Sequence, residues 1–185
     1  MKRVAILASY NGSGFDALHV ALKNGELSIE IPLIISNNSS AKILENATNL
    51  GIDNFVVNSK TAQNPDEKIE ELLKEYKCEY LFLSGYMKKV NINIIKNFKV
   101  INSHPALLPN YGGEGMYGRF VHEAVIKNSE KISGVTIHEV NENYDEGKIL
   151  LQKELLLDKD ESVDSLEKKI KKLEQIAIVE IFKNI

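Results

Sequence analysis

The feature that most constrains the fold is an alternation of short apolar runs with segments of helical periodicity, which continues through residues 1–104. The apolar runs are typical of strands buried on both faces of a sheet, and the segments between them are typical of amphipathic helices. We expect strands at 3–9, 29–36, 54–58, 79–85 and 99–104, and helices at 15–25, 41–51, 64–77 and about 91–98. This order predicts an α/β fold: an open, mostly parallel, Rossmann-like sheet with right-handed crossovers and helices on both faces.

The pattern changes after Tyr117. A predicted helix at 119–128 is followed by two apolar stretches, 133–140 and 147–157, that are close enough to form a hairpin around "NENYDEG". A final helix is expected from about Ser162 onward. Because the 185 residues contain no linker-like stretch, we predict a single domain, residues 1–185.

Composition narrows the range of functions. The chain has 23 Lys and Arg against 26 Asp and Glu, so its net charge of −3 gives no basic excess for nucleic acid or an anionic membrane. The basic start "MKRVAILAS" contains five consecutive apolar residues, too few for a signal peptide or a membrane span. We therefore expect a cytoplasmic protein. The one cysteine, Cys78, is expected to be a small buried hydrophobic residue.

The first candidate site is the turn "SYNGSG" at 9–14, between the first predicted strand and its helix. In open α/β sheets this turn lies at the carboxyl edge, where a helix N-terminus offers unpaired N–H groups to an anion. Gly12 and Gly14 allow close approach of the backbone, and Ser13 adds a hydroxyl. The stretch matches neither the dinucleotide motif nor the P-loop, so phosphate binding and an ordinary turn both remain open.

The second candidate site is "VINSHPALLPNYGGEGMYG", residues 100–118. Asn102 and His104 are two residues apart at the end of a predicted strand, so their side chains can project on the same side. Pro105 favours an extended conformation for His104. An imidazole beside an amide can stabilise charge that develops on a carbonyl oxygen. The alternative is a buried structural histidine with a capping asparagine.

The third candidate is Asp145, in the loop of the predicted hairpin. A carboxylate can orient an imidazole and stabilise its protonated form, although a loop aspartate is more often a turn former. Sequence spacing does not settle whether Asp145 reaches His104, or whether His138 points into the cleft or the core. A metal site of His104, His122, His138 and Asp145 lacks any recognised ligand spacing, so we expect no metal.

Four motifs together resemble the glycinamide ribonucleotide formyltransferases, folate-dependent enzymes of purine synthesis. The motifs are "NGSG" at 11–14, "LSGYM" at 83–87, "INSHPALLPNYGGEGMYG" at 101–118 and "HEVNENYDEGKIL" at 138–150. The resemblance extends over essentially the whole chain. It implies transfer of the formyl group of the co-substrate 10-formyltetrahydrofolate to the amine of glycinamide ribonucleotide, the third step of purine (IMP) synthesis.

The resemblance also implies residue roles. Asn102 and His104 would stabilise the oxyanion of the tetrahedral intermediate, and Asp145 would keep His104 charged and assist proton transfer. The glycine-rich stretch 111–118 would be a mobile flap over the folate. Residues 1–100 would form the phosphate-binding and nucleotide-binding half, and residues 101–185 the catalytic and folate-binding half.

The implied binding residues form two sets. The ribonucleotide would contact Asn11, Gly12, Ser13, Gly14, Lys171 and Glu174. The folate would contact Tyr86, Met87, Lys88, Lys89, Val90, Asn141 and Tyr144. This chain departs from the common family pattern at Tyr10 and Gly14 of the phosphate turn, where a side-chain contact is lost, and at Lys88, where arginine is usual. The implied partners are the two small molecules, with no nucleic acid and no membrane, and the implied assembly is a monomer or homodimer.

Several rivals share the catalytic trio. Methionyl-tRNA formyltransferase has a further C-terminal domain, formyltetrahydrofolate hydrolase usually has an N-terminal regulatory domain, and sugar-nucleotide formyltransferases do not combine this phosphate turn with this last helix. A rival of another class is a nucleotide-binding module without catalysis. The presence of Asn102, His104 and Asp145 together disfavours that module, because binding alone needs none of them.

Overall fold

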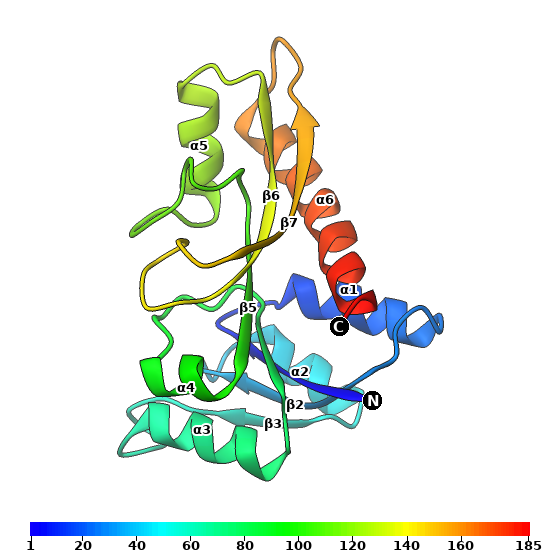
Figure 1. The fold of residues 1–185 in the computed structure, drawn as a ribbon, viewed down its shortest axis with the longest axis vertical. Coiled ribbons are helices and arrows are strands. Elements are labelled where there is room, and N and C mark those ends of the chain that lie inside the picture. The colour runs from blue at the N-terminus through cyan, green and yellow to red at the C-terminus, as the bar shows by residue number, and fades with distance from the viewer.

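The computed structural model describes residues 1–185, which form one seven-stranded sheet with helices on both faces (Figure 1). The strand order is β3-β2-β1-β4-β5-β6-β7. The strands are β1 (Lys2–Ala8), β2 (Ile29–Ser36), β3 (Asp53–Val56), β4 (Tyr80–Leu83), β5 (Lys99–His104), β6 (Ile132–Glu139) and β7 (Ile149–Leu156). The helices are α1 (Ser13–Lys23), α2 (Lys42–Asn49), α3 (Pro65–Glu75), α4 (Ile92–Asn97), α5 (Arg119–Lys127) and α6 (Val163–Lys183).

The predicted α/β class is confirmed. The five strands β1–β5 are parallel to one another, whereas β6 pairs antiparallel with β5, and β7 pairs antiparallel with β6 as the predicted hairpin. The strand order reverses between β1 and β4, which is the position where open α/β sheets form their binding crevice.

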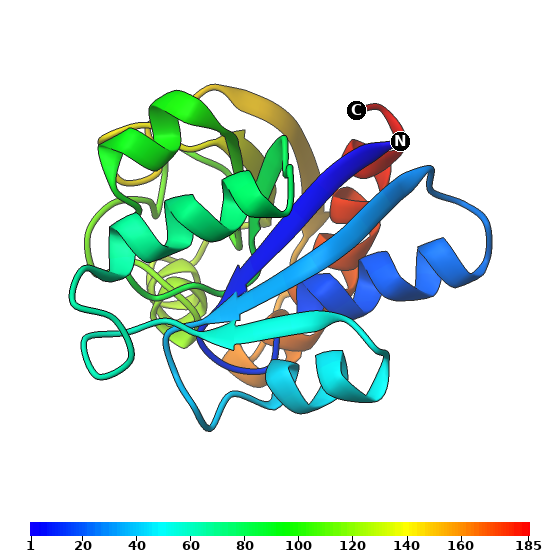
Figure 2. The same cartoon turned by 90° about the horizontal axis from the view of Figure 1, so that it is seen from below.

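The continuous apolar runs are explained by burial on both faces of the sheet. In β1, Val4 and Ile6 pack into a core that includes α1, α2 and α6, while Ala5 and Leu7 pack into a second core under α3 and α4. Figure 2 shows α1 and α2 on one side of β1–β3, with α3 and α4 on the other. Because a strand alternates its side chains between faces, a strand covered on both sides must be apolar throughout.

Local signals set the start of α3 as predicted. Asn64 Oδ1 accepts a hydrogen bond from the N–H of Glu67 at the start of α3, with Pro65 in the first helical position. Ser162 caps α6 in the same manner. No helix combines the length and the hydropathy that a transmembrane span requires.

Candidate active site

Polar residues gather where β1 and β4 end, at the carboxyl edge of the parallel strands. The hydroxyl of Ser9, which follows β1, donates to Asn37 Oδ1 (2.7 Å) and accepts from the N–H of Met87 (2.9 Å). The N–H of Ser9 donates to the carbonyl of Gly85 (3.2 Å). These bonds hold the turn after β1 against the segment after β4, so two of the predicted binding segments lie side by side.

The end of β5 brings His104 against Asp145 of the β6–β7 loop. His104 Nδ1 lies 3.5 Å from Asp145 Oδ2, and only 4% of the imidazole and 12% of the carboxylate are exposed. His104 Nε2 lies 2.7 Å from the carbonyl oxygen of Tyr111. The N–H of Gly113 donates to Asp145 Oδ2 (3.0 Å). The structure thus unites an imidazole and a carboxylate that are 41 positions apart in the sequence.

Asn102 is connected to this pair through His138. Asn102 and His138 are direct neighbours across β5 and β6, and Asn102 Nδ2 lies 3.1 Å from His138 Nε2. His138 Nδ1 lies 2.9 Å from the carbonyl of Glu139, so the tautomer that satisfies both contacts carries its proton on Nδ1. His138 Nε2 is also 3.5 Å from Asp145 Oδ1. The sequence left open whether the His138 side chain points into the core or into the cleft. Its pairing with Asn102 across β5 and β6 places that side chain beside Asn102.

Burial and neighbouring groups have opposite effects on the pKa values of His104 and Asp145. Burial lowers the pKa of His104 below its ordinary value, although the nearby Asp145 carboxylate opposes this effect. For Asp145, burial alone would raise the pKa. The neighbouring imidazoles of His138 and His104 and the N–H of Gly113 outweigh burial and hold the pKa of Asp145 below its ordinary value. Asp145 is therefore ready to stabilise a proton on His104.

The turn at 9–14 has the features of an anion site. Gly12 has φ of +68°, and a Cβ there would meet the Ile43 side chain at 2.3 Å, so glycine is required. The N–H groups of Asn11, Gly12 and Ser13 have no acceptor within the protein. They lie at the N-terminus of α1, where the helix dipole favours negative charge.

Gly14 differs from the other residues of this turn. The N–H groups of Gly14 and Phe15 both donate to Ser84 Oγ at the end of β4, at 3.1 and 3.2 Å. A Cβ at position 14 would lie 2.8 Å from the ring of Phe82. A side chain at position 14 would therefore force Phe82 or Ser84 to shift.

The predicted ribonucleotide contacts on α6 lie beside β5. Glu174 Oε1 accepts a hydrogen bond from the Ser103 hydroxyl (2.5 Å), and Ser103 lies between Asn102 and His104. Burial raises the pKa of Glu174 above its ordinary value. Lys171 Nζ is exposed and pairs with Glu167 (2.7 Å). The structure therefore brings this part of α6 to the same end of β5 as the His104–Asp145 pair.

The predicted folate segments approach each other from β4 and from the β6–β7 loop. The ammonium of Lys89 lies 5.5 Å from the centre of the Tyr144 ring, within cation–π distance. Met87 and Lys88 are exposed, and burial raises the pKa of Tyr86 to about 12. Val90 is buried in the core under α3 and α4, so its contribution to a binding surface is through its backbone.

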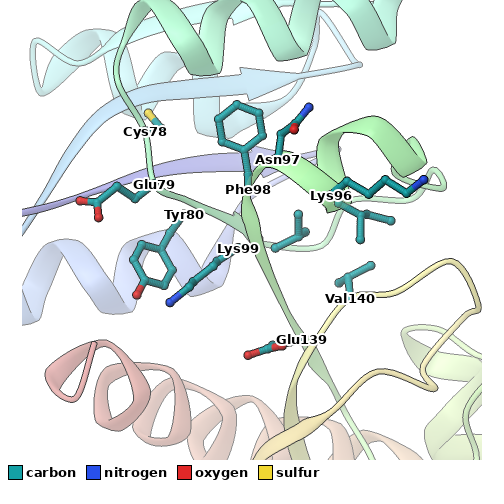
Figure 3. Close-up of a pocket in the computed structure, with 11 residues that line it drawn as sticks. Cys78, Glu79, Tyr80, Lys96, Asn97, Phe98, Lys99, Glu139 and Val140 are labelled. Carbon is teal, nitrogen blue, oxygen red and sulfur yellow. The ribbon is translucent and has the colours of Figure 1, made fainter.

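A separate cavity of about 530 Å³ lies at the opposite edge of the parallel strands, where β4 and β5 begin (Figure 3). It contains none of the predicted site residues. Cys78 lies in its wall, and burial raises the pKa of the thiol to about 11, consistent with an unreactive side chain. No group of three or more His, Cys, Asp or Glu side chains in the structure is arranged to hold a metal ion.

A family profile described as "Formyl transferase" matches residues 2–182, almost the whole chain. The chain belongs to the formyl transferase family. A protein of Bacillus subtilis named phosphoribosylglycinamide formyltransferase is 32% identical over 179 residues, which is 94% of this chain and 89% of that protein.

Chloroplastic proteins with the same name match this formyl transferase over parts of their length. The Arabidopsis thaliana protein is 32% identical over 97% of this chain, and the Vigna unguiculata protein is 35% identical over 82% of it. The matched parts are 64% and 50% of those proteins, respectively. The crystal structure of glycinamide ribonucleotide transformylase 1 from Symbiobacterium toebii superimposes with a TM-score of 0.90 at 26% identity, over 99% of this chain and 86% of that one.

Proposed function

We propose that this formyl transferase moves the formyl group of 10-formyltetrahydrofolate to the amine of glycinamide ribonucleotide, giving the formylated ribonucleotide and tetrahydrofolate. The observation that carries the proposal is the buried His104–Asp145 pair, 3.5 Å apart, with Asn102 and His138 beside it at the carboxyl edge. Relatives named for this reaction, which match nearly the whole chain, support the choice of substrates.

The chemistry assigned to these residues follows from their types and positions. The substrate amine attacks the formyl carbon, the carbonyl oxygen becomes an oxyanion, and the bond from that carbon to N10 of the folate then breaks. Protonated His104 and the Asn102 amide donate hydrogen bonds to the oxyanion. An amide has two N–H donors, so Asn102 can serve the oxyanion with one while the other faces His138. Asp145 stabilises the protonated imidazole and assists the transfer of the proton that leaves the amine to N10 of the folate.

The glycine-rich segment regulates access to His104 in this scheme. The Nε2 atom of His104 lies against the carbonyl of Tyr111, the residue that opens the stretch 111–118. Tyr111 has a positive φ of 58°, and the φ angles of Gly113, Gly115 and Gly118 are also positive. We assign this stretch as a flap that shifts when folate binds, so that the formyl oxygen replaces the Tyr111 carbonyl.

The two substrates take separate places. The phosphate lies on the free N–H groups of Asn11, Gly12 and Ser13, and the ribose lies toward Lys171 and Glu174. Gly14 contributes by fitting the turn beneath Phe82 rather than by donating to the phosphate. The folate lies between the two segments that carry Lys89 and Tyr144. The remaining folate contacts are Tyr86, Met87, Lys88, Val90 and Asn141.

The test is the consumption of 10-formyltetrahydrofolate with and without glycinamide ribonucleotide. We expect turnover that requires the ribonucleotide and that falls at least about 100-fold in His104→Ala, because an oxyanion donor and proton carrier is lost. His19→Ala is the matched control, since His19 lies in α1 outside the site. Turnover without ribonucleotide would indicate the hydrolase. Folate binding without turnover would indicate another formyl acceptor, as in a sugar-nucleotide enzyme, or a non-catalytic module.

The proposal also covers the location of the enzyme, its partners and its oligomeric state. We assign it to the cytoplasm and to small-molecule partners, without nucleic acid. A monomer and a homodimer both remain predictions, and light scattering of the purified chain distinguishes them.

A further inference from the structure

An open groove of about 680 Å³ lies between α1 and α6 and contains none of the residues assigned to the active site. The two helices pack against each other on one face of the sheet (Figure 2). Val20 of α1 and Ile176 of α6 both line the groove, and their relative exposures are 56% and 58%. Large apolar side chains that gather at one hollow of the surface indicate a contact with another molecule.

The two sides of the groove carry opposite charges. The charged residues that line it are Asp16 and Glu26 on the α1 side, and Lys172, Glu180 and Lys183 on α6. The carboxylate of Glu180 is paired with Lys153 of β7 (2.7 Å), which neutralises it. The α1 side is therefore acidic, and the α6 side is basic.

The two sides also present their residues in the same order. Lys183, at the end of α6, pairs with Glu26, which follows the end of α1 (2.9 Å), so α1 and α6 run in the same sense along the groove. On the α1 side the sequence places Val20 between the two carboxylates. On α6 it likewise places Ile176 between the two lysines.

The charges at the other end of the groove lack such a pairing. Lys169, Lys171 and Lys183 of α6 each form an ion pair within the chain, whereas Lys172 forms none. Burial is the largest influence on Asp16 and raises its pKa, so the cations of its own chain do not fully compensate this carboxylate.

We propose that the groove between α1 and α6 binds a second copy of this chain, with a two-fold axis that runs along the groove. This axis places α1 of each copy on α6 of its partner, and every contact occurs twice. Asp16 then faces the partner's Lys172. Between the charged ends, Val20 faces the partner's Ile176. A two-fold interface requires a surface that complements itself, and an acidic helix parallel to a basic helix meets this requirement.

The size of the groove sets the expected strength. Residues 172–183 of α6 span about 16 Å at a rise of 1.5 Å per residue, so the contact is small. Small interfaces are typical of reversible association, and we expect exchange between monomer and dimer at micromolar concentrations. The inference does not depend on formyl transfer, because the groove contains no residue assigned to a substrate.

The first experiment is sedimentation velocity of the purified chain from low to high micromolar concentration. We expect a dimer that forms as the concentration rises. Ile176→Lys should weaken association at least about tenfold, because it places a charge in the apolar contact of both copies. Leu156→Lys is the matched control, since Leu156 is 75% exposed at the end of β7 and lies outside the groove.

A pair of charge reversals tests the contact between the two helices. In Asp16→Lys two ammonium groups would face each other at each contact, and in Lys172→Glu two carboxylates would do so. Each variant alone should therefore associate at least about tenfold more weakly than the wild type. An equimolar mixture of the two variants restores opposite charges at both contacts, so a mixed dimer should form. Restored association also shows that both variants are folded.

Three results would overturn the inference. The first is a wild type that stays monomeric at every concentration. The second is a dimer that Ile176→Lys leaves intact, because the two-fold contact then lies elsewhere. The third is a mixture of the charge-reversed variants that associates no better than either variant alone. None of these results bears on formyl transfer, which turnover tests separately.

Discussion

Replacing Asp145 with asparagine tests the charge relationship at the centre of the site. The side chain keeps its size and its ability to accept from the N–H of Gly113, but it loses the negative charge 3.5 Å from His104 Nδ1. The substitution therefore isolates the charge from the shape of the loop. We expect the fold to be retained and catalysis to fall.

The magnitude follows from the separation. Two opposite unit charges 3.5 Å apart attract by about 5 kcal/mol at an effective dielectric constant of about 20. Water that enters the site and the remaining amide–imidazole contact recover part of this energy. We expect about 3–4 kcal/mol of lost transition-state stabilisation, which corresponds to a rate about 100- to 1,000-fold lower.

The assay is the pH dependence of kcat/KM for the ribonucleotide. Burial lowers the pKa of His104 and Asp145 opposes that lowering, so removing the carboxylate lowers the pKa further. The protonated ring is then lost at a lower pH, and the alkaline limb of the profile moves to lower pH. A loss of less than tenfold with an unmoved alkaline limb would refute the assigned role of Asp145.

Two further predictions concern stability. Gly14→Asn should lower the free energy of unfolding by about 1–3 kcal/mol in urea denaturation, because its Cβ would lie 2.8 Å from the Phe82 ring. The additional substitution Phe82→Leu should restore part of this loss. An unchanged urea midpoint in Gly14→Asn would contradict the packing argument. Burial lowers the pKa of both His104 and His122 below the ordinary value of 6.5, so the unfolded chain binds more protons and stability is lost as the pH falls through 6.5 toward the folded pKa values. The urea midpoint should therefore fall between pH 7.5 and 5.5, and by less in His122→Leu than in the wild type; equal falls would show that His122 does not titrate as expected.

Much of the fold could be predicted because its signals are local. The apolar runs of β1, β2 and β4 report burial on both faces, and Asn64 and Pro65 specify the start of α3. The hairpin of β6 and β7 followed from the short distance between two apolar stretches. The antiparallel pairing of β6 with β5 was not specified, because pairing between distant strands leaves no local pattern.

The residues of the site could be predicted from the sequence, but the contacts between their side chains could not. Asn102, His104 and Asp145 could be named from the sequence, whereas the link through His138 depends on the register of β5 against β6. The hydrogen bond that the N–H of Gly14 donates to Ser84 Oγ depends on where β4 ends relative to α1.

The most direct test of the proposed formyl transfer follows the carbon atom itself. The purified chain is mixed with 10-formyltetrahydrofolate labelled with ¹³C in the formyl group and with glycinamide ribonucleotide, and the products are examined by NMR and mass spectrometry. Our account predicts that the label moves to the ribonucleotide amine in the wild type and not in His104→Ala. Label that stays on the folate, or that is released as free formate, would contradict it.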